Sequence, residues 1–91
     1  MALASKRRAQ LRSQAQSLNP VVMVGHDGIT EGVVGALDQA LTDHELVKVR
    51  FQSFKDRTKD LAVELEKATA SELVAVTGFT AVYYRKTVLK A

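Results

Sequence analysis

Two glycines three positions apart, Gly25 and Gly28, enclose the dipeptide His26-Asp27 in an otherwise apolar part of the chain. A run of valines precedes them and an amphipathic stretch follows, which predicts a strand, a glycine turn and the start of a helix. The free N–H groups of a helix's first turn attract anions, and glycine lets a phosphate oxygen approach the backbone closely. This segment therefore has the parts needed to hold one phosphodiester group without reading a base.

The GxxG spacing alone is a weak signal, because a plain turn between a strand and a helix has the same pattern. The charge distribution favours an anionic partner, since the first acidic residue of the chain is Asp27. The segment before it carries four basic side chains: Lys6, Arg7, Arg8 and Arg12. One-sided positive charge of this kind suits a polyanion, although an ordinary solvated helix face gives the same composition. We expect this basic segment to lie near the glycine loop.

Two carboxylates weaken the case for a phosphate at the loop. Asp27 lies at its tip and Glu31 at the start of the following helix. Each exposed carboxylate opposes a nearby phosphate by about 1 kcal/mol at low salt. They could instead cap the helix or face a different kind of partner.

Three elements are predicted in the first half of the chain. Residues 4–18 have helix-forming composition and a narrow apolar stripe, and Asn19-Pro20 ends this helix. Residues 21–24 form a short β-branched run, which is typical of a strand buried on both faces. Residues 31–43 repeat apolar side chains at helical spacing, with Thr30 as the expected N-cap.

The second half begins with a strictly alternating strand, residues 46–51, whose polar face carries Lys48 and Arg50. Residues 56–70 fit both a strand and a helix, and their length and their Ala, Glu and Lys content favour the helix. Two apolar runs within residues 73–85 are joined by Gly78-Phe79, which predicts a hairpin with a type II′ turn.

The predicted order is α-β-α-β-α-β-β in a chain of 91 residues. Helical crossovers make the first three strands parallel, and the hairpin makes the fourth antiparallel to the third. The fold class is therefore α/β, in the sense of a two-layer α+β domain with a four-stranded mixed sheet. The length allows one domain, residues 1–91.

Several functional classes are disfavoured. The chain has no cysteine, no P-loop, no dinucleotide fingerprint and no metal-ligand spacing, and its two histidines, His26 and His44, lack partners at catalytic spacing. We expect no enzyme activity, cofactor, metal or small-molecule substrate. No apolar run is long enough to span a membrane, and no signal peptide is recognisable, so we expect a soluble cytoplasmic protein.

Two long stretches resemble a known family. "LNPVVMVGHDGITEGVVGALDQALTDHELVKVR" and "VTGFTAVYYR" look like the YhbY-type CRM domain, the chloroplast RNA splicing and ribosome maturation module, and the similarity runs from Lys6 to Arg85. The features that carry it are Pro20, Gly25 and Gly28, Thr30-Glu31-Gly32-Val33, His44-Glu45-Leu46-Val47-Lys48-Val49, Gly78 and Tyr84-Arg85. The sequence departs from the family at His26-Asp27 and at Phe79, where basic or amide residues are common.

The resemblance implies a fold similar to the C-terminal domain of bacterial translation initiation factor three. It also implies RNA binding through the GxxG loop and nearby basic surface, with ribosomal RNA or a precursor of the large ribosomal subunit as the partner. The expected RNA-binding residues are Gly25, His26, Asp27, Gly28, Ile29, Thr30, Lys6, Arg7, Arg8, Arg12, Lys48, Arg50 and Arg85.

Three questions remain open from the sequence. The domain could be a protein-interaction module of the translation machinery without direct RNA contact, because its loop tip carries mixed charge. A third alternative, which the sequence supports less strongly, is an enzyme that binds a small phosphorylated ligand at the start of the second predicted helix. Tyr83 and Tyr84 could offer one ring for base stacking, or both could be packed inside the domain.

Overall fold

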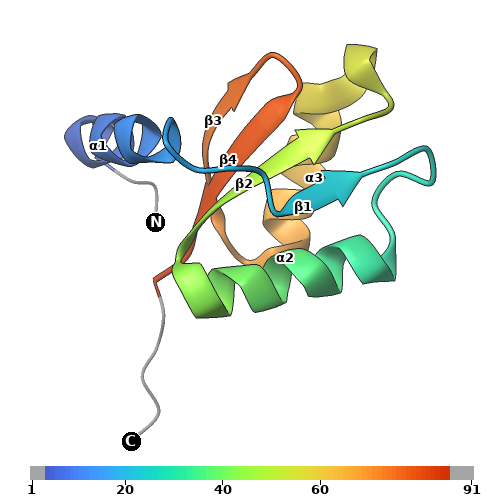
Figure 1. Ribbon diagram of the computed structural model, residues 1–91, viewed down its shortest axis with the longest axis horizontal. Coiled ribbons are helices and arrows are strands. Elements are labelled where there is room, and N and C mark those ends of the chain that lie inside the picture. The colour runs from blue at the N-terminus through green and yellow to red at the C-terminus, as the bar shows by residue number, and fades with distance from the viewer. Residues whose placement is uncertain (1–3, 87–91) are drawn as a thin grey trace, which may run out of the picture.

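The computed structural model describes residues 4–86, which form one sheet with helices on both of its faces (Figure 1). The elements in chain order are α1 (Ser5–Ala15), β1 (Val22–Val24), α2 (Glu31–His44), β2 (Leu46–Phe51), the 3-10 helix η1 (Lys55–Arg57), α3 (Thr58–Thr69), β3 (Glu72–Thr77) and β4 (Thr80–Tyr84). The predicted order of helices and strands is confirmed, including the helix at residues 58–69.

The sheet is four-stranded, with the order β1-β2-β4-β3. β1 and β2 are parallel, and β4 lies between β2 and β3, antiparallel to both. The first three strands therefore point the same way, as the crossover argument predicts. Their C-terminal ends meet at one edge of the sheet, which we call the carboxyl edge. The loop after β1, the segment after β2 and the β3–β4 turn all emerge there.

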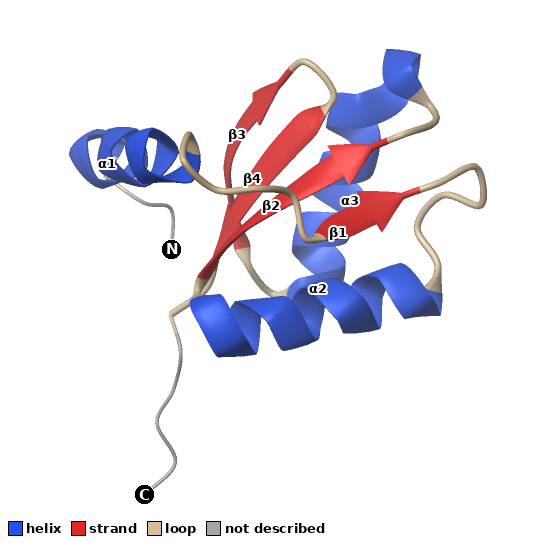
Figure 2. Cartoon of the chain, viewed as in Figure 1, coloured by secondary structure: helices blue, strands red, loops and turns tan. Residues whose placement is uncertain are grey.

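The two faces of the sheet are covered unequally. α2 and α3 cover one face with a large core, which includes Leu37, Leu65 and Phe51. On the other face α1 inserts Leu11 and Ala15 against β3 and β4, in a smaller cluster. Figure 2 shows α1 at one end of the sheet, well separated from the loop that follows β1. The opposite end of this second face is left open.

Two predictions about the first half of the chain are wrong. β1 is not buried on both faces: it is an edge strand in which Met23 is 45% exposed, because α1 does not reach it. α1 ends at Ala15 rather than at residue 18, because a turn follows in which the Ser17 hydroxyl donates to the carbonyl of Gln14 and the N–H of Leu18 donates to that of Ala15.

The predicted local signals at two other places are confirmed. The Thr30 hydroxyl oxygen accepts a hydrogen bond from the N–H of Val33 at 3.1 Å, so this residue caps α2. Gly78 has φ +58 and Phe79 does not have a positive φ, which is the pattern of a type II′ turn. Within residues 4–86, no helix combines the length and the apolar character needed to cross a bilayer.

Tyr83 supplies the first testable prediction, because it is fully buried and its hydroxyl donates to the carbonyl of Ala62 at 2.8 Å. Burial raises the pKa of Tyr83 above its ordinary value of 10.0, and the negative charge of Glu66 adds to this effect. Tyr83→Phe should lower the free energy of unfolding by about 1 kcal/mol at neutral pH, because it removes this buried hydrogen bond.

The same pKa shift fixes the sign of a pH dependence. Since folding holds the proton on Tyr83, the stability that this group contributes is complete below pH 10.0 and falls as the pH rises further. Urea unfolding across this range should therefore show a smaller alkaline loss in the phenylalanine variant than in the wild type. Equal losses would show that Tyr83 ionises as readily in the folded domain as in the unfolded chain.

Candidate nucleic-acid interface

The glycine loop is a tight turn at the carboxyl edge. The N–H of Gly28 donates to the carbonyl of Gly25 at 3.0 Å, and Gly28 has φ +74, a conformation that favours glycine. A Cβ on Gly28 would lie 3.7 Å from the Phe54 ring, so this glycine is covered by the segment after β2. The turn lifts His26 and Asp27 into solvent, with side chains that are 90% and 78% exposed.

The start of α2 is less open to an anion than the sequence predicts. The Thr30 hydroxyl already occupies the N–H of Val33, and Gly28 is buried. Of the first-turn donors, those of Glu31 and Gly32 have no acceptor within the helix, because the first turn of any helix lacks one. Glu31 itself places an exposed carboxylate at this entrance. The loop is thus a projecting tip, and its positive potential is modest.

The expectation that the basic N-terminal segment lies near the loop is wrong. Figure 1 shows α1 and the β1–α2 loop at opposite ends of the longest axis of the domain. α1 packs where β2 begins and β4 ends, against Leu46 and Tyr84, whereas the loop leaves β1 at the carboxyl edge. α1 and the loop are neighbours in the chain but separated in space, because a linker of residues 16–21, which begins with a turn, joins α1 to β1.

The basic side chains of α1 differ in what they contact. The Arg8 guanidinium donates to the carbonyls of Leu73 and Val74 at 2.6 and 3.2 Å and lies 3.9 Å from a carboxylate oxygen of Glu72. Arg8 therefore ties α1 to β3. The Arg7 guanidinium stacks on the Tyr84 ring at 5.4 Å but remains exposed. Lys6 and Arg12 are also exposed.

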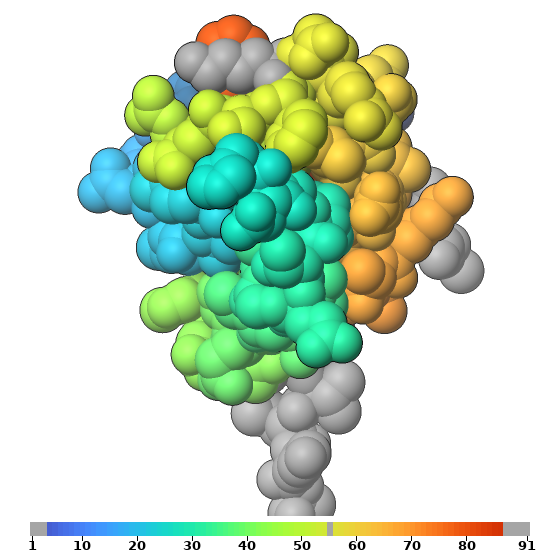
Figure 3. Space-filling view, turned by 90° about the vertical axis from the view of Figure 1, so that its right-hand side faces the viewer, coloured from blue at the N-terminus to red at the C-terminus, as the bar shows by residue number. Residues whose placement is uncertain are grey.

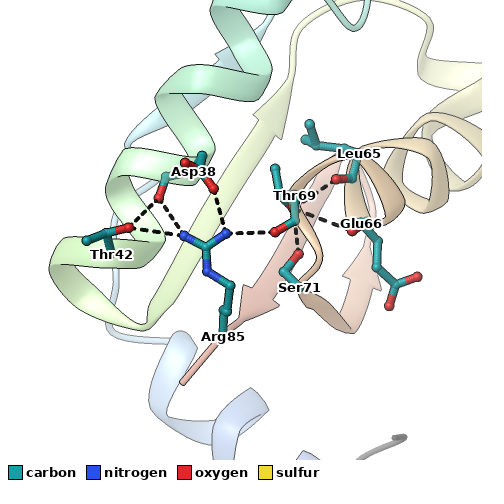
Figure 4. Close-up of polar contacts among 7 residues, drawn as sticks. All are labelled: Asp38, Thr42, Leu65, Glu66, Thr69, Ser71 and Arg85. Carbon is teal, nitrogen blue, oxygen red and sulfur yellow. Dashed lines mark hydrogen bonds and ion pairs between the residues drawn. The ribbon is translucent and has the colours of Figure 1, made fainter. Parts of the chain in front are cut away.

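Arg85 is engaged in the fold. Its guanidinium contacts the Asp38 carboxylate at 2.6 Å, the Thr69 carbonyl at 2.7 Å and the Asp38 carbonyl at 2.8 Å (Figure 4). A fourth contact, at 3.1 Å, reaches the Thr42 hydroxyl. One side chain thus joins the second half of α2 to the end of α3.

The structure does bring three of the predicted basic residues together on the uncovered part of the second sheet face. Arg12 and Lys48 line one shallow groove, and Arg50 follows two residues later on the same side of β2. Arg50 pairs across the sheet with Met23 and with Thr80. We call this surface the open face; its residues are Arg12, Met23, Lys48, Arg50, Thr77 and Thr80. It contains no acidic side chain.

Phe54 was not among the residues predicted from the sequence, although a phenylalanine inside the polar stretch "QSFKDR" was a visible signal. Phe54 and Phe79 are 37% and 44% exposed, and both follow strand ends at the carboxyl edge. Figure 3 views this end of the domain and shows the loop after β1 beside the segment after β2. The tyrosines are placed elsewhere: Tyr83 is in the core and Tyr84 packs under α1.

Carboxylate and imidazole side chains can hold a metal ion where several of them converge. In the part of the chain that the structure describes, no three His, Asp or Glu side chains are arranged to hold a metal ion. His26 and Asp27 lie close together, with the Nε2 and Oδ1 atoms 3.5 Å apart. Both side chains are solvated at the loop tip, so they lack the enclosed setting in which such pairs gain their reactivity.

Comparisons with known proteins match nearly the whole chain. The profile of the CRS1 / YhbY (CRM) domain matches residues 3–85. A probable RNA-binding protein of Pseudomonas aeruginosa is 40% identical over 87 residues, covering 94% of this chain and 84% of that protein. An RNA-binding protein of Haemophilus influenzae is 38% identical over 84 residues, covering 91% of this chain and 85% of that protein.

A solved structure confirms the fold. The solution structure of a hypothetical protein from Staphylococcus aureus superimposes with a TM-score of 0.83 at 38% identity, covering 98% of this chain and 94% of that one. The three helices and the four-stranded mixed sheet are therefore shared by a natural relative. The expected likeness to the C-terminal domain of translation initiation factor three stays a prediction.

The contacts of Arg85 give a second prediction. Arg85→Met should lower the free energy of unfolding by about 2 kcal/mol, because it leaves the Thr69 carbonyl without this charged donor. The exposed ion pair with Asp38 contributes little of that value. The matched control is Lys86→Met, which removes the same charge from an exposed neighbouring side chain. Chemical denaturation should give a clearly lower free energy of unfolding for Arg85→Met than for Lys86→Met. Equal free energies of unfolding would contradict the structural role of Arg85.

Proposed function

Because this chain belongs to the CRS1 / YhbY (CRM) domain family, we propose that it is an RNA-binding domain. The observation that carries the proposal is the open face, on which Arg12, Lys48 and Arg50 gather with no carboxylate among them. Relatives that this chain matches over more than nine-tenths of its length are named as RNA-binding proteins, which supports the same conclusion.

The open face suits a phosphate backbone for geometric reasons. Side chains two residues apart on a strand point to the same side and are separated by about 7 Å, so Lys48 and Arg50 form the middle of a basic track. Arg12 extends this track toward α1 through the groove that it shares with Lys48. The Thr77 and Thr80 hydroxyls add neutral donors beside the track. Long basic side chains on a firm sheet can follow a backbone without reading its sequence.

The glycine loop forms the other end of the proposed RNA path. It leaves β1 directly after Val24, on the strand that borders Arg50. Residues 25–30 would contact RNA through the exposed tip and the first N–H groups of α2, in addition to the track on the sheet. α1, which carries Lys6 and Arg7, lies at the far end of the domain, where these side chains would contribute long-range attraction.

We further propose that the RNA is ribosomal, and that the domain assists assembly of the large ribosomal subunit in the cytoplasm. This finer assignment rests on the family resemblance. Crosslinking the intact protein to RNA in precursor ribosomal particles tests it. Crosslinks concentrated on precursor large-subunit RNA support it, and crosslinks spread over unrelated transcripts contradict it.

A second function is favoured by Asp27 and Glu31, whose carboxylates stand at the loop. In that alternative the domain binds a protein of the translation machinery and does not touch RNA. Titration with ribosomal RNA fragments free of protein separates the two. Salt-sensitive binding supports the RNA-binding proposal, and no binding at low salt supports the alternative.

The basic track gives a third prediction. The double change Lys48→Glu and Arg50→Glu should weaken RNA affinity by at least about tenfold and should flatten the dependence of affinity on salt, because fewer counterions are released. The measurement is fluorescence anisotropy of labelled ribosomal RNA fragments at several salt concentrations.

A charge-matched control keeps this test specific. Lys67→Glu makes a single equivalent reversal at an exposed position of α3, which covers the opposite face of the sheet. It should change the affinity far less than either reversal on β2 made singly. Equal losses at Lys67 and at Lys48 would mean that net charge alone, and not the open face, governs binding.

The loop tip gives a fourth prediction. Asp27→Lys should strengthen RNA binding several-fold at low salt, because it replaces a repulsive charge at a 78% exposed side chain with an attractive one. Asp43→Lys, at the exposed far end of α2, is the control. If both variants respond alike, the tip is not in contact with the RNA.

A further inference from the structure

Two exposed phenylalanines stand at the carboxyl edge, and the RNA-binding proposal so far gives them no role. Phe54 is 37% exposed and Phe79 is 44% exposed. Large apolar rings are costly to leave in water, and elsewhere in this domain the aromatic residues Phe51 and Tyr83 are fully buried. Part of each ring is therefore accessible to a ligand at this edge.

Phe54 is held in an unusual conformation. Its backbone has φ 57 and ψ 42, the left-handed region that disfavours a side chain with a Cβ atom. Its carbonyl accepts a hydrogen bond from the N–H of Arg57 at 2.8 Å, which fixes the backbone at the start of η1. Its ring lies beside Gly28, since a Cβ built on that glycine would be 3.7 Å from the Phe54 Cε2 atom, an ordinary contact distance. The ring is thus fixed against the glycine loop while part of it faces solvent.

The backbone of Phe79 is held at the same edge by a hydrogen bond to the end of β2. It occupies the β3–β4 turn, and its carbonyl accepts a hydrogen bond from the N–H of Phe51 at 2.7 Å. Phe51 ends β2, and the segment that carries Phe54 begins directly after it. Both rings are therefore attached to the C-terminal end of β2, the strand that carries Lys48 and Arg50.

We propose that Phe54 and Phe79 stack against unpaired bases, so that the ligand of this surface is single-stranded RNA rather than a duplex. This inference rests on the proposed function, because the basic track would hold the backbone whose bases reach the rings. Along the chain, Phe54 lies between the exposed Arg50 and Arg57, whose positive charge is partly offset by Asp56 in η1. Aromatic rings beside a basic track are the usual means of binding single strands with little sequence preference.

Base pairing in a duplex buries the faces of the bases, so rings fixed at a sheet edge could reach them only in loops, bulges or free ends. An apolar protein surface could also cover two phenylalanines, but the exposed Arg50 and Arg57 in the same part of the chain favour an anionic ligand. Unpaired bases can be distinguished from an apolar protein surface as the occupant by comparing two ligands of equal charge, one that carries bases and one that lacks them.

The experiment uses the full chain and two ligands of about ten nucleotides, a length within the range of single-strand binding sites. One is a single-stranded RNA that contains 2-aminopurine, and the other is an abasic ribose-phosphate chain of equal charge. The wild type should bind the RNA roughly tenfold more tightly than the abasic chain and should quench the 2-aminopurine fluorescence. A hairpin duplex of equal charge should bind no better than the abasic chain.

The variants are Phe54→Leu with Phe79→Leu, which keep apolar bulk but remove both rings. This double variant should bind the RNA and the abasic chain equally and should keep the salt dependence of the wild type. Phe54→Tyr with Phe79→Tyr should retain the preference for bases. Leu18→Ala, a change at a 36% exposed side chain near α1, is the control and should leave the preference intact.

The outcomes distinguish this inference from the proposal on which it rests. If the wild type binds RNA and the abasic chain equally, with salt sensitivity, stacking is excluded and the proposed function stands. If the leucine double variant is folded by thermal denaturation and keeps the base preference, other residues read the bases. If the wild type binds no nucleic acid at low salt, both proposals fall.

Discussion

The packing of α1 on the second face of the sheet decides what the rest of the domain can present to a partner. Leu11 and Ala15 are each 1% exposed and lie against Val74 and Val82. This contact, reinforced by Arg8 on the carbonyls of β3, confines α1 to one end of the sheet. The linker of residues 16–21 borders Lys48 on this face, and the C-terminal part of β1 and β2 beyond it stays open. The alternation of β2 directs Lys48 and Arg50 to this face.

The same contact explains why the proposed RNA surface is a track rather than a single pocket. α1 carries its positive charge away from the glycine loop, to the far end of the longest axis. Lys48 and Arg50 on β2 bridge the distance between these two regions. A domain of this size can thus contact an extended ligand at several points without enclosing it, and each point contributes modestly to the affinity.

Local signals in the sequence predicted the fold well. The Thr30 cap, the alternation of residues 46–51 and the Gly78-Phe79 turn each depend on neighbours in the chain, and the structure confirms all three. The direction of the strands followed from the handedness of helical crossovers. The CRM resemblance was confirmed by the match over residues 3–85.

The predictions that failed depended on distant contacts. The sequence cannot show which strand forms an edge, so Met23 was expected to be buried. It also cannot show that Arg8 and Arg85 contact backbone carbonyls, and the assignment of these two arginines to RNA stays a prediction. Phe54 escaped notice because its neighbour across the fold, Gly28, is far away in the chain.

The central claim is that RNA lies across the open face and ends at the carboxyl edge. The most direct measurement is an NMR titration of the isotope-labelled protein with single-stranded ribosomal RNA, followed through the backbone amides. The account predicts that the shifts concentrate at Met23, at residues 48–51 and in the loop 25–28, while the exposed side of α3 stays unchanged. Shifts concentrated on α3 and on the outer side of α2 would contradict it.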